Sequence, residues 1–301
     1  MADGNHLNLG DRGSVEGAGW MYPPLIINSA LTGIIPSKKD NQHVPISPAE
    51  IAQDAKRCYE AGTRIVHVHA RDADGTATWN PSIYAEIIGS IREVCPELIV
   101  CTSTSGRNFS ELEKRSAVLQ LKGKLRPDMA SLTLGSMNFP KQASVNPPEV
   151  VQGLAQIMAE NGIKPELEVF EPGMIDYAHY LIEKGILKPP FYMNMFLGSL
   201  GTTSAKPENL VHMINALPEG IVWAVAGVGR FQLYVNVMAV AMQGNVRVGI
   251  EDNIWYDAKR TRPATNVDLV KRLVGIAQSM GRRLATAAEV RAALGIAPLA
   301  P

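Results

Sequence analysis

The feature that most constrains the fold is an alternation of short apolar runs with longer amphipathic runs, repeated eight times. Runs that are apolar on both faces are typical of parallel strands covered by helices, and the amphipathic runs predict crossover helices. The expected strands are residues 25–31, 64–70, 98–104, 129–134, 166–171, 191–197, 221–226 and 246–250. The expected helices are residues 47–62, 81–95, 110–121, 147–162, 174–185, 206–217, 232–244, 266–281 and 286–295.

Eight strand–helix units without a break in composition predict a single α/β domain, a (β/α)8 TIM barrel over residues 24–301. Residues 1–23 are polar and rich in glycine, and we expect them to form an N-terminal extension. The alternative is an open doubly wound sheet. That fold favours a G-x-G-x-x-G motif after the first strand, and "LTGIIPS" (31–37) lacks it.

The composition limits the kinds of binding partner and the cellular compartment that we expect. Lys+Arg and Asp+Glu both number 29, so no basic excess favours nucleic acid or an anionic membrane. The three cysteines form no C-x-x-C pair, which indicates free thiols in a reducing cytoplasm; a catalytic Cys101 is the alternative. The N-terminus lacks a signal-peptide pattern, and no apolar run reaches the ~18 residues of a membrane span. We expect a soluble cytoplasmic protein.

The stretch "IVHVHARDADG" (65–75) places two histidines at the end of an expected core strand. His67 and His69 are two residues apart, so both side chains point to one face of the strand. Active sites of such barrels lie at the C-terminal ends of the strands, and paired imidazoles there are typical of a metal site. The alternative is a pair of core histidines with ordinary hydrogen bonds.

A catalytic zinc commonly takes three protein ligands, and "VRVGIEDN" (246–253) offers the third. Strands two and eight flank strand one in a closed barrel, so Glu251 can meet the two histidines; a solvated acidic loop is the alternative. Arg247 begins the same strand and can bind a carboxylate or stabilise an oxyanion beside Asp252. It can instead form a structural ion pair with Glu168 or Glu171.

Two further strand ends carry candidate binding groups. "CTSTSGR" (101–107) places hydroxyls such as Ser103 where they could bind a carboxylate or carbonyl oxygen, although such a run is also common in loops. "AGVGRFQ" (226–232) combines backbone amides at a helix start with Arg230, which indicates an anion site. The sequence has no Ser-His-Asp arrangement that would indicate a serine hydrolase.

Together these motifs resemble the family of β-keto acid cleavage enzymes, over about residues 23–297. The resemblance rests on "GTRIVHVHARDADG", "LIVCTSTSG", "PDMASLTLGSMNF", "PELEVFEPGMI", "KPENLVHMINALP", "WAVAGVGR" and "GNVRVGIEDNIW". It implies a zinc enzyme in which a β-keto acid and acetyl-CoA give acetoacetate and a new acyl-CoA. It also implies a homotetramer or homodimer.

The resemblance assigns roles to individual residues. It implies zinc ligands at His67, His69 and Glu251, a proton-removing pair at Arg247 and Asp252, and substrate-site positions at Ser103, Ser131 and Glu168. Arg230 or Lys206 would meet the CoA phosphates at the rim.

Two features refine this hypothesis. Where the 3-keto-5-aminohexanoate cleavage enzyme has an acid facing the substrate amine, this chain has Ile35, which predicts a substrate with a neutral or apolar tail. The alternative function is a zinc-dependent hydrolase of the amidohydrolase kind, which also uses H-x-H in a barrel. That class has the motif on the first strand and further histidines at later strand ends, and "EVFEPG" and "MFLGSL" lack them.

Overall fold

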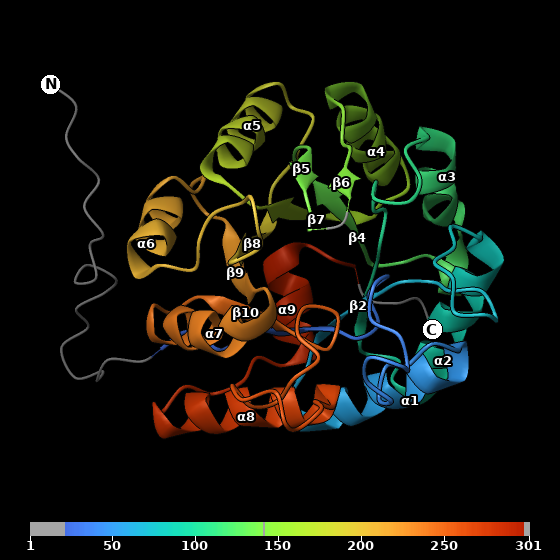
Figure 1. The fold of residues 1–301 in the computed structure, drawn as a ribbon. Helices are drawn as coiled ribbons and strands as arrows, with labels where there is room; N and C mark the ends of the chain where they lie inside the picture. Colours follow the sequence, from blue (N-terminus) through green and yellow to red (C-terminus); the bar gives the residue numbers. More distant parts are fainter. Residues whose placement is uncertain (1–21, 141, 298–301) are drawn as a thin grey trace, which may run out of the picture.

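The structure is a computed structural model that describes residues 22–140 and 142–297, and it is a closed barrel of eight parallel strands surrounded by helices (Figure 1). This confirms the predicted (β/α)8 architecture, while residues 1–21 of the predicted extension lie outside the described residues. Around the barrel, β10 closes against β1. The barrel strands are β1 Ile27–Ala30, β2 Ile65–Val68, β3 Ile99–Thr102, β4 Met129–Thr133, β7 Lys164–Val169, β8 Tyr192–Leu197, β9 Val222–Gly227 and β10 Asn245–Val248.

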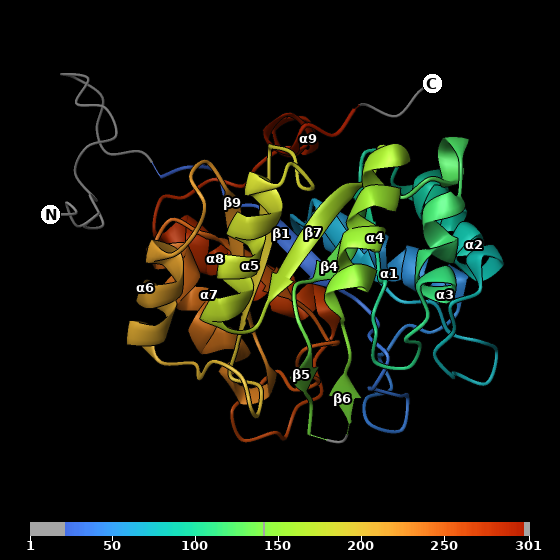
Figure 2. The same cartoon turned by 90° about the horizontal axis from the view of Figure 1, so that it is seen from above.

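Helices follow the strands and cover the outside of the barrel (Figure 1). They are α1 Pro48–Ala61, α2 Pro81–Val94, α3 Leu112–Ser116, α4 Pro148–Glu160, α5 Pro172–Glu183, α6 Pro207–Asn215, α7 Gln232–Ala241 and α8 Asn266–Ser279. The last helix, α9 Ala287–Leu294, lies across one end of the barrel (Figure 2). Within the described ranges, no helix combines the length and the apolar character needed to cross a membrane.

The bounds of α1 follow from local chemistry that can be identified in the sequence. The Ser47 side chain accepts a hydrogen bond from the Glu50 amide, and Glu50 reaches back to the Ser47 amide, so the two form a capping box. Pro48 occupies the first turn, where its missing N–H costs nothing. Gly62 ends the helix at φ 128°, as expected from its position.

The structure differs from the prediction in two places. The helix expected over residues 110–121 is a short α3 followed by a 3₁₀ turn, Ala117–Gln120. Buried Arg115 bonds the Thr104 carbonyl and Asn146, which holds this segment against the barrel. After β4, a hairpin of β5 (Met137–Asn138) and β6 (Ala143–Ser144) also forms, and two-residue strands leave no periodic signal in a sequence.

The N-terminal end of the barrel is closed by α9, on the side opposite to the β5–β6 hairpin (Figure 2). Val290 and Leu294 of α9 are fully buried in one apolar cluster with the first residues of the strands, among them Ile65 and Ile99. An open cavity lies at the opposite end, the C-terminal mouth. Barrels of this type have their active sites at that end.

Candidate active site

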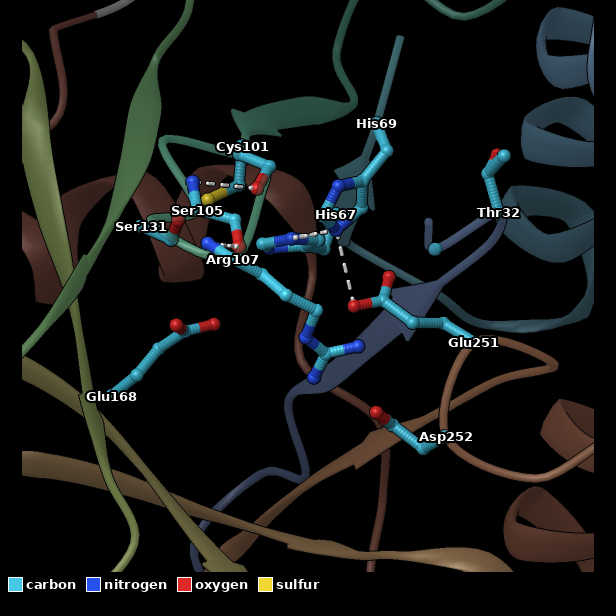
Figure 3. Close-up of polar contacts among 12 residues, drawn as sticks. Thr32, His67, His69, Cys101, Ser105, Arg107, Ser131, Glu168, Glu251 and Asp252 are labelled. Carbon is cyan, nitrogen blue, oxygen red and sulfur yellow. Dashed lines mark hydrogen bonds and ion pairs between the residues drawn. The ribbon is translucent and has the colours of Figure 1, made fainter. Parts of the chain in front are cut away.

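His67 on β2, His69 directly after that strand and the acidic pair after β10 meet at the C-terminal mouth of the barrel (Figure 3). The Nε2 atoms of His67 and His69 are 3.2 Å apart. Glu251 reaches them from beyond β1, with its Oε1 3.2 Å from Nε2 of His69. Ligand atoms from all three side chains lie within 4.8 Å of one another. The structure therefore brings the predicted metal-ligating residues together.

Two glycines make this approach possible. A Cβ atom on Gly33 would lie 2.7 Å from Cγ of Glu251, and the φ of +64° at Gly33 also disfavours any other residue. A Cβ atom on Gly249 would lie 1.9 Å from the carbonyl oxygen of Ala30. The end of β10 can thus approach β1 closely enough for Glu251 to reach the histidines.

The chemistry of these three residues fits a divalent metal ion. Two imidazoles and one carboxylate form a ligand set that catalytic zinc sites use with a fourth position open. Oε2 of Glu251 is buried and has no hydrogen-bond partner among the described residues, so a ligating atom is available. Cys101 lies nearby, but burial raises the pKa of its thiol well above the usual value, which argues against the catalytic-cysteine alternative.

Arg247 lies at the centre of the charged groups. Its Nε is 3.1 Å from Oδ2 of Asp252, and its Nη2 is 2.7 Å from Oε1 of Glu251. Its Nη1 is 3.8 Å from Glu166 and 3.6 Å from Glu168, so the ion pair with Glu168 that was the structural alternative for Arg247 also forms. Burial alone would lower the pKa of Arg247, but these carboxylates raise it, and the guanidinium stays charged.

The carboxylates around Arg247 differ in their electrostatics. Burial alone would raise the pKa of Glu251, but His69 and Arg247 hold it well below the usual range. Burial raises the pKa of Asp252, and Arg247 offsets this only in part; the same holds for Glu168. Asp252 and Glu168 are thus more basic than ordinary carboxylates, while Glu251 stays ionised, as a metal ligand must.

The other residues predicted to bind substrate, Ser103, Ser131 and Arg230, differ in where they lie relative to the cavity. Ser103 is buried in the cavity wall, and its hydroxyl accepts a hydrogen bond from the Ser105 amide. The Ser131 hydroxyl is occupied by the Thr104 amide at 3.0 Å. Arg230 is exposed beyond β9, with its guanidinium over the Phe231 ring. The structure does not bring Arg230 together with the metal-ligating residues, and its role remains a prediction.

The site opens into a cavity of about 220 Å³. The apolar part of its lining, called the outer wall below, is formed by Ile34, Ile35, Pro36, Met137, Phe139, Phe170, Phe196 and Val228.

Arg107 is a cavity residue that sequence reasoning missed. Its side chain extends toward the space between Glu168 and the Glu251–Asp252 pair (Figure 3). The guanidinium lies 3.5 Å from the centroid of the Phe139 ring, and its Nε is buried without a hydrogen-bond partner among the described residues. Arg107 closes the quoted "CTSTSGR" motif, but nothing in the sequence indicates which way it points.

Comparison with known proteins identifies the family to which the chain is similar. The family model for β-keto acid cleavage enzymes matches residues 24–296. A 3-keto-5-aminohexanoate cleavage enzyme from Fusobacterium nucleatum is 38% identical over 278 residues, covering 92% of this chain and 99% of the relative. A 3-oxoadipate:acetyl-CoA acetyltransferase from Cupriavidus necator is 36% identical, covering 92% and 96% of the two chains.

Among solved structures, the apo structure of ObcA superposes with a TM-score of 0.73 at 20% identity, covering 84% of this chain and 66% of that chain. At this identity the likeness supports the barrel fold alone. The family match and the two relatives go further, and the catalytic class follows from them. The chain therefore belongs to the β-keto acid cleavage enzyme family, as a carbon–carbon bond-cleaving acyltransferase.

Proposed function

We propose that the chain is zinc-dependent and exchanges acyl groups between a β-keto acid and acetyl-CoA, giving acetoacetate and a new acyl-CoA. The observation that carries this proposal is the Arg247–Asp252 pair beside His67, His69 and Glu251 at one cavity. The name of the C. necator relative supports acetyl-CoA as co-substrate.

The products determine which bonds change, and the following order of steps is consistent with them. The β-keto acid and acetoacetate share a CH2–carboxylate unit, so its carbon, C2, must exchange one acyl group for another. C2 therefore loses a proton and attacks the thioester carbonyl of acetyl-CoA, which releases the CoA thiolate. The thiolate then attacks the original keto carbon and breaks its bond to C2, and C2 takes the proton back.

Asp252 is the group proposed to move this proton. Its carboxylate is held by Arg247 from two sides, with Nε 3.1 Å from Oδ2 and Nη2 3.4 Å from Oδ1. Such a two-point contact fixes the direction of the carboxylate, and a raised pKa makes it a better base. Arg247 also supplies a fixed positive charge for the oxyanions that form. Zinc, held by His67, His69 and Glu251, would polarise the keto group and bind the substrate carboxylate.

We propose that the acyl tail is neutral or apolar. The tail would lie against the outer wall, where Ile34 and Ile35 offer no counter-charge to an amine. The guanidinium of Arg107 faces the same cavity and would repel a cationic tail but attract an anionic one, so only the apolar lining favours an uncharged tail over an anionic tail. Phe139 and Phe170 add apolar surface to this wall. A panel of β-keto acids with cationic, anionic and uncharged tails tests this proposal, and a charged tail turned over best would contradict it.

The remaining inferences concern the rim, the assembly and the compartment. Exposed Arg230 and Lys206 are the basic groups proposed to meet the CoA phosphates.

A homotetramer or homodimer is proposed because Leu233, Tyr234 and Val237 leave an exposed apolar face on α7. The three cysteines are buried and free, which supports a reducing, cytoplasmic location.

The decisive experiment measures metal content and activity together. Protein purified without added metal would be assayed with acetoacetate and propionyl-CoA, the reverse direction, for formation of acetyl-CoA, with His67→Ala in parallel. About one zinc per chain and activity in the parent alone would support the proposal. Bound zinc without acyl exchange for any CoA ester would favour the hydrolase alternative, and absence of bound metal would refute the zinc site.

A further inference from the structure

Glu166 lies beneath the proposed metal site, and the mechanism above does not use it. It belongs to β7, points into the barrel and is fully buried. One carboxylate oxygen, Oε2, is 2.6 Å from Nδ1 of His67 and 3.2 Å from Sγ of Cys101. The other, Oε1, accepts hydrogen bonds from the side-chain amides of Asn28 at 2.6 Å and Asn194 at 2.7 Å. The carboxylate therefore sits among donors on both sides.

This arrangement determines which nitrogen of His67 carries a proton. A neutral imidazole has one N–H and one lone pair, and the nitrogen facing an ionised carboxylate must be the donor. Nδ1 faces Glu166, so Nδ1 donates and the lone pair is left on Nε2. Nε2 is the atom that lies 3.2 Å from Nε2 of His69, inside the proposed metal site.

We propose that Glu166 is a positioning residue that holds His67 in the tautomer and orientation needed to bind zinc. This inference rests on the proposed function, because it assumes a zinc ion between His67, His69 and Glu251. Carboxylates that accept the second N–H of a ligating histidine orient the ring and raise its basicity, and their loss typically costs about 10–100-fold in metal affinity.

The surroundings of Glu166 explain why a carboxylate is needed there. A glutamine has one acceptor oxygen and one donor amide group. If its amide group faced Asn28 and Asn194, donors would oppose donors unless both asparagines turned their Oδ1 atoms, which have no hydrogen-bond partner among the described residues, toward it. If it faced His67, Nδ1 would have to accept, the proton would move to Nε2, and the metal-binding lone pair would be lost. Both orientations disturb the site, although the side chains have nearly the same shape.

Glu168 provides a matched control on the same strand and the same face. It is also a buried glutamate near Arg247, with its Oε1 3.6 Å from Nη1. Its Oε2, however, accepts a hydrogen bond from the Thr133 hydroxyl at 2.7 Å rather than from a histidine. Replacing Glu168 removes a comparable charge from the same region but leaves the contact with His67 intact.

The test compares zinc affinity, measured by competition with a chromophoric chelator, in the parent, Glu166→Gln and Glu168→Gln. We expect Glu166→Gln to bind zinc about 10–100-fold more weakly, and Glu168→Gln to change affinity by less than about threefold. Thermal unfolding of the metal-free proteins controls for folding. Glu166→Asp, which keeps a carboxylate but shortens its reach, is a second variant expected to lie between the parent and Glu166→Gln.

A second readout does not depend on zinc. Nitrogen NMR of His67 in the metal-free protein, at alkaline pH where the imidazole is neutral, should show the proton on Nδ1 in the parent and a changed tautomer balance in Glu166→Gln. Equal zinc affinities of Glu166→Gln and the parent, or an Nε2–H tautomer in the parent, would overturn the inference and leave the proposed function standing. Absence of zinc binding by the parent would overturn both.

Discussion

One carboxylate at each end of the barrel shows how the two ends differ. At the closed end, both oxygens of Asp128 are bonded: Oδ1 to Arg291 of α9 at 3.0 Å, and Oδ2 to the Val100 amide at 2.9 Å. At the mouth, Glu251 keeps one buried oxygen without a hydrogen-bond partner among the described residues. Buried polar groups are normally paired, because leaving one unpaired costs about 1–3 kcal/mol. The paired carboxylate of Asp128 stabilises the closed end, whereas that oxygen of Glu251 leaves the mouth able to bind a ligand.

The largest effect is expected from loss of a metal-ligating residue at the mouth. His69→Ala should lower kcat/KM by roughly 10⁴-fold, because polarisation by a metal ion contributes several kcal/mol and 1.4 kcal/mol corresponds to a factor of ten. The melting temperature of the metal-free protein should change little. The activity assay is combined with zinc analysis of the same protein. If the variant kept both its zinc and its activity, the mouth would not be the end that receives the ligand.

Asp252→Asn should lower kcat by about 10²–10⁴-fold, since general base catalysis contributes on that scale. Zinc content should stay at the parent level, because Asp252 is not among the three residues proposed to hold the ion. Steady-state kinetics with metal analysis checks this. A large rise in KM with kcat unchanged would show that Asp252 binds substrate rather than moving a proton.

At the closed end, Leu294→Ala should lower the free energy of unfolding by about 2–4 kcal/mol, because it leaves a cavity in a fully buried cluster. Zinc affinity and KM should remain those of the parent. Urea unfolding and kinetics on the same preparation test both statements. If the change in KM, converted to a free energy, were as large as the loss in the free energy of unfolding, the two ends would be coupled.

Ile35→Glu tests a second comparison, within the mouth, between the charged residues around Arg247 and the apolar outer wall of the cavity. A carboxylate at this position should shift the ratio of kcat/KM toward cationic tails by about tenfold, the effect of one partly exposed charge pair. Arg107→Met is the companion variant, and it should shift the ratio in the same direction by removing a repulsive charge. If neither variant changes the ratio, the tail does not contact this wall.

The smallest expected effect concerns the cap of α9. Arg283 and the Thr286 amide, through their hydrogen bonds, lower the pKa of Glu289 to about 2. A carboxyl whose pKa is lower in the folded than in the unfolded state stabilises the fold above its unfolded pKa, here near 4.5, and this contribution fades as the pH falls toward 2. Glu289→Gln should therefore unfold slightly more easily than the parent at neutral pH, and the difference should shrink as the pH falls. A difference in urea midpoint that does not change with pH would refute this linkage.

Much of the fold and part of the site could be predicted from the sequence, for physical reasons that particular residues illustrate. His67 and His69 share a face because side chains alternate along a strand, and Glu251 is near them because a closed barrel places the last strand beside the first. The direction of Arg107 could not be predicted. It depends on Phe139, which lies between the two-residue strands β5 and β6. The predicted substrate role of Ser131 stays a prediction; its hydroxyl accepts a hydrogen bond from the backbone amide of Thr104, in the loop that follows the neighbouring strand β3, and no sequence pattern indicated that contact.

The loop between β1 and α1 is held in a way that bears on how such enzymes change substrates. Arg71 is buried at the end of β2, and its guanidinium bonds the main-chain carbonyls of Gly33, at 3.0 and 2.7 Å, and Pro36, at 2.7 Å. Main-chain carbonyls are present whatever the side chains, so the path of the loop does not depend on Ile34 or Ile35. The relatives named for aminohexanoate and oxoadipate substrates show how far tail preference varies in this family. Under the proposed placement of the tail, substitutions at Ile34 or Ile35 would alter the tail preference while Arg71 keeps its contacts with the loop backbone.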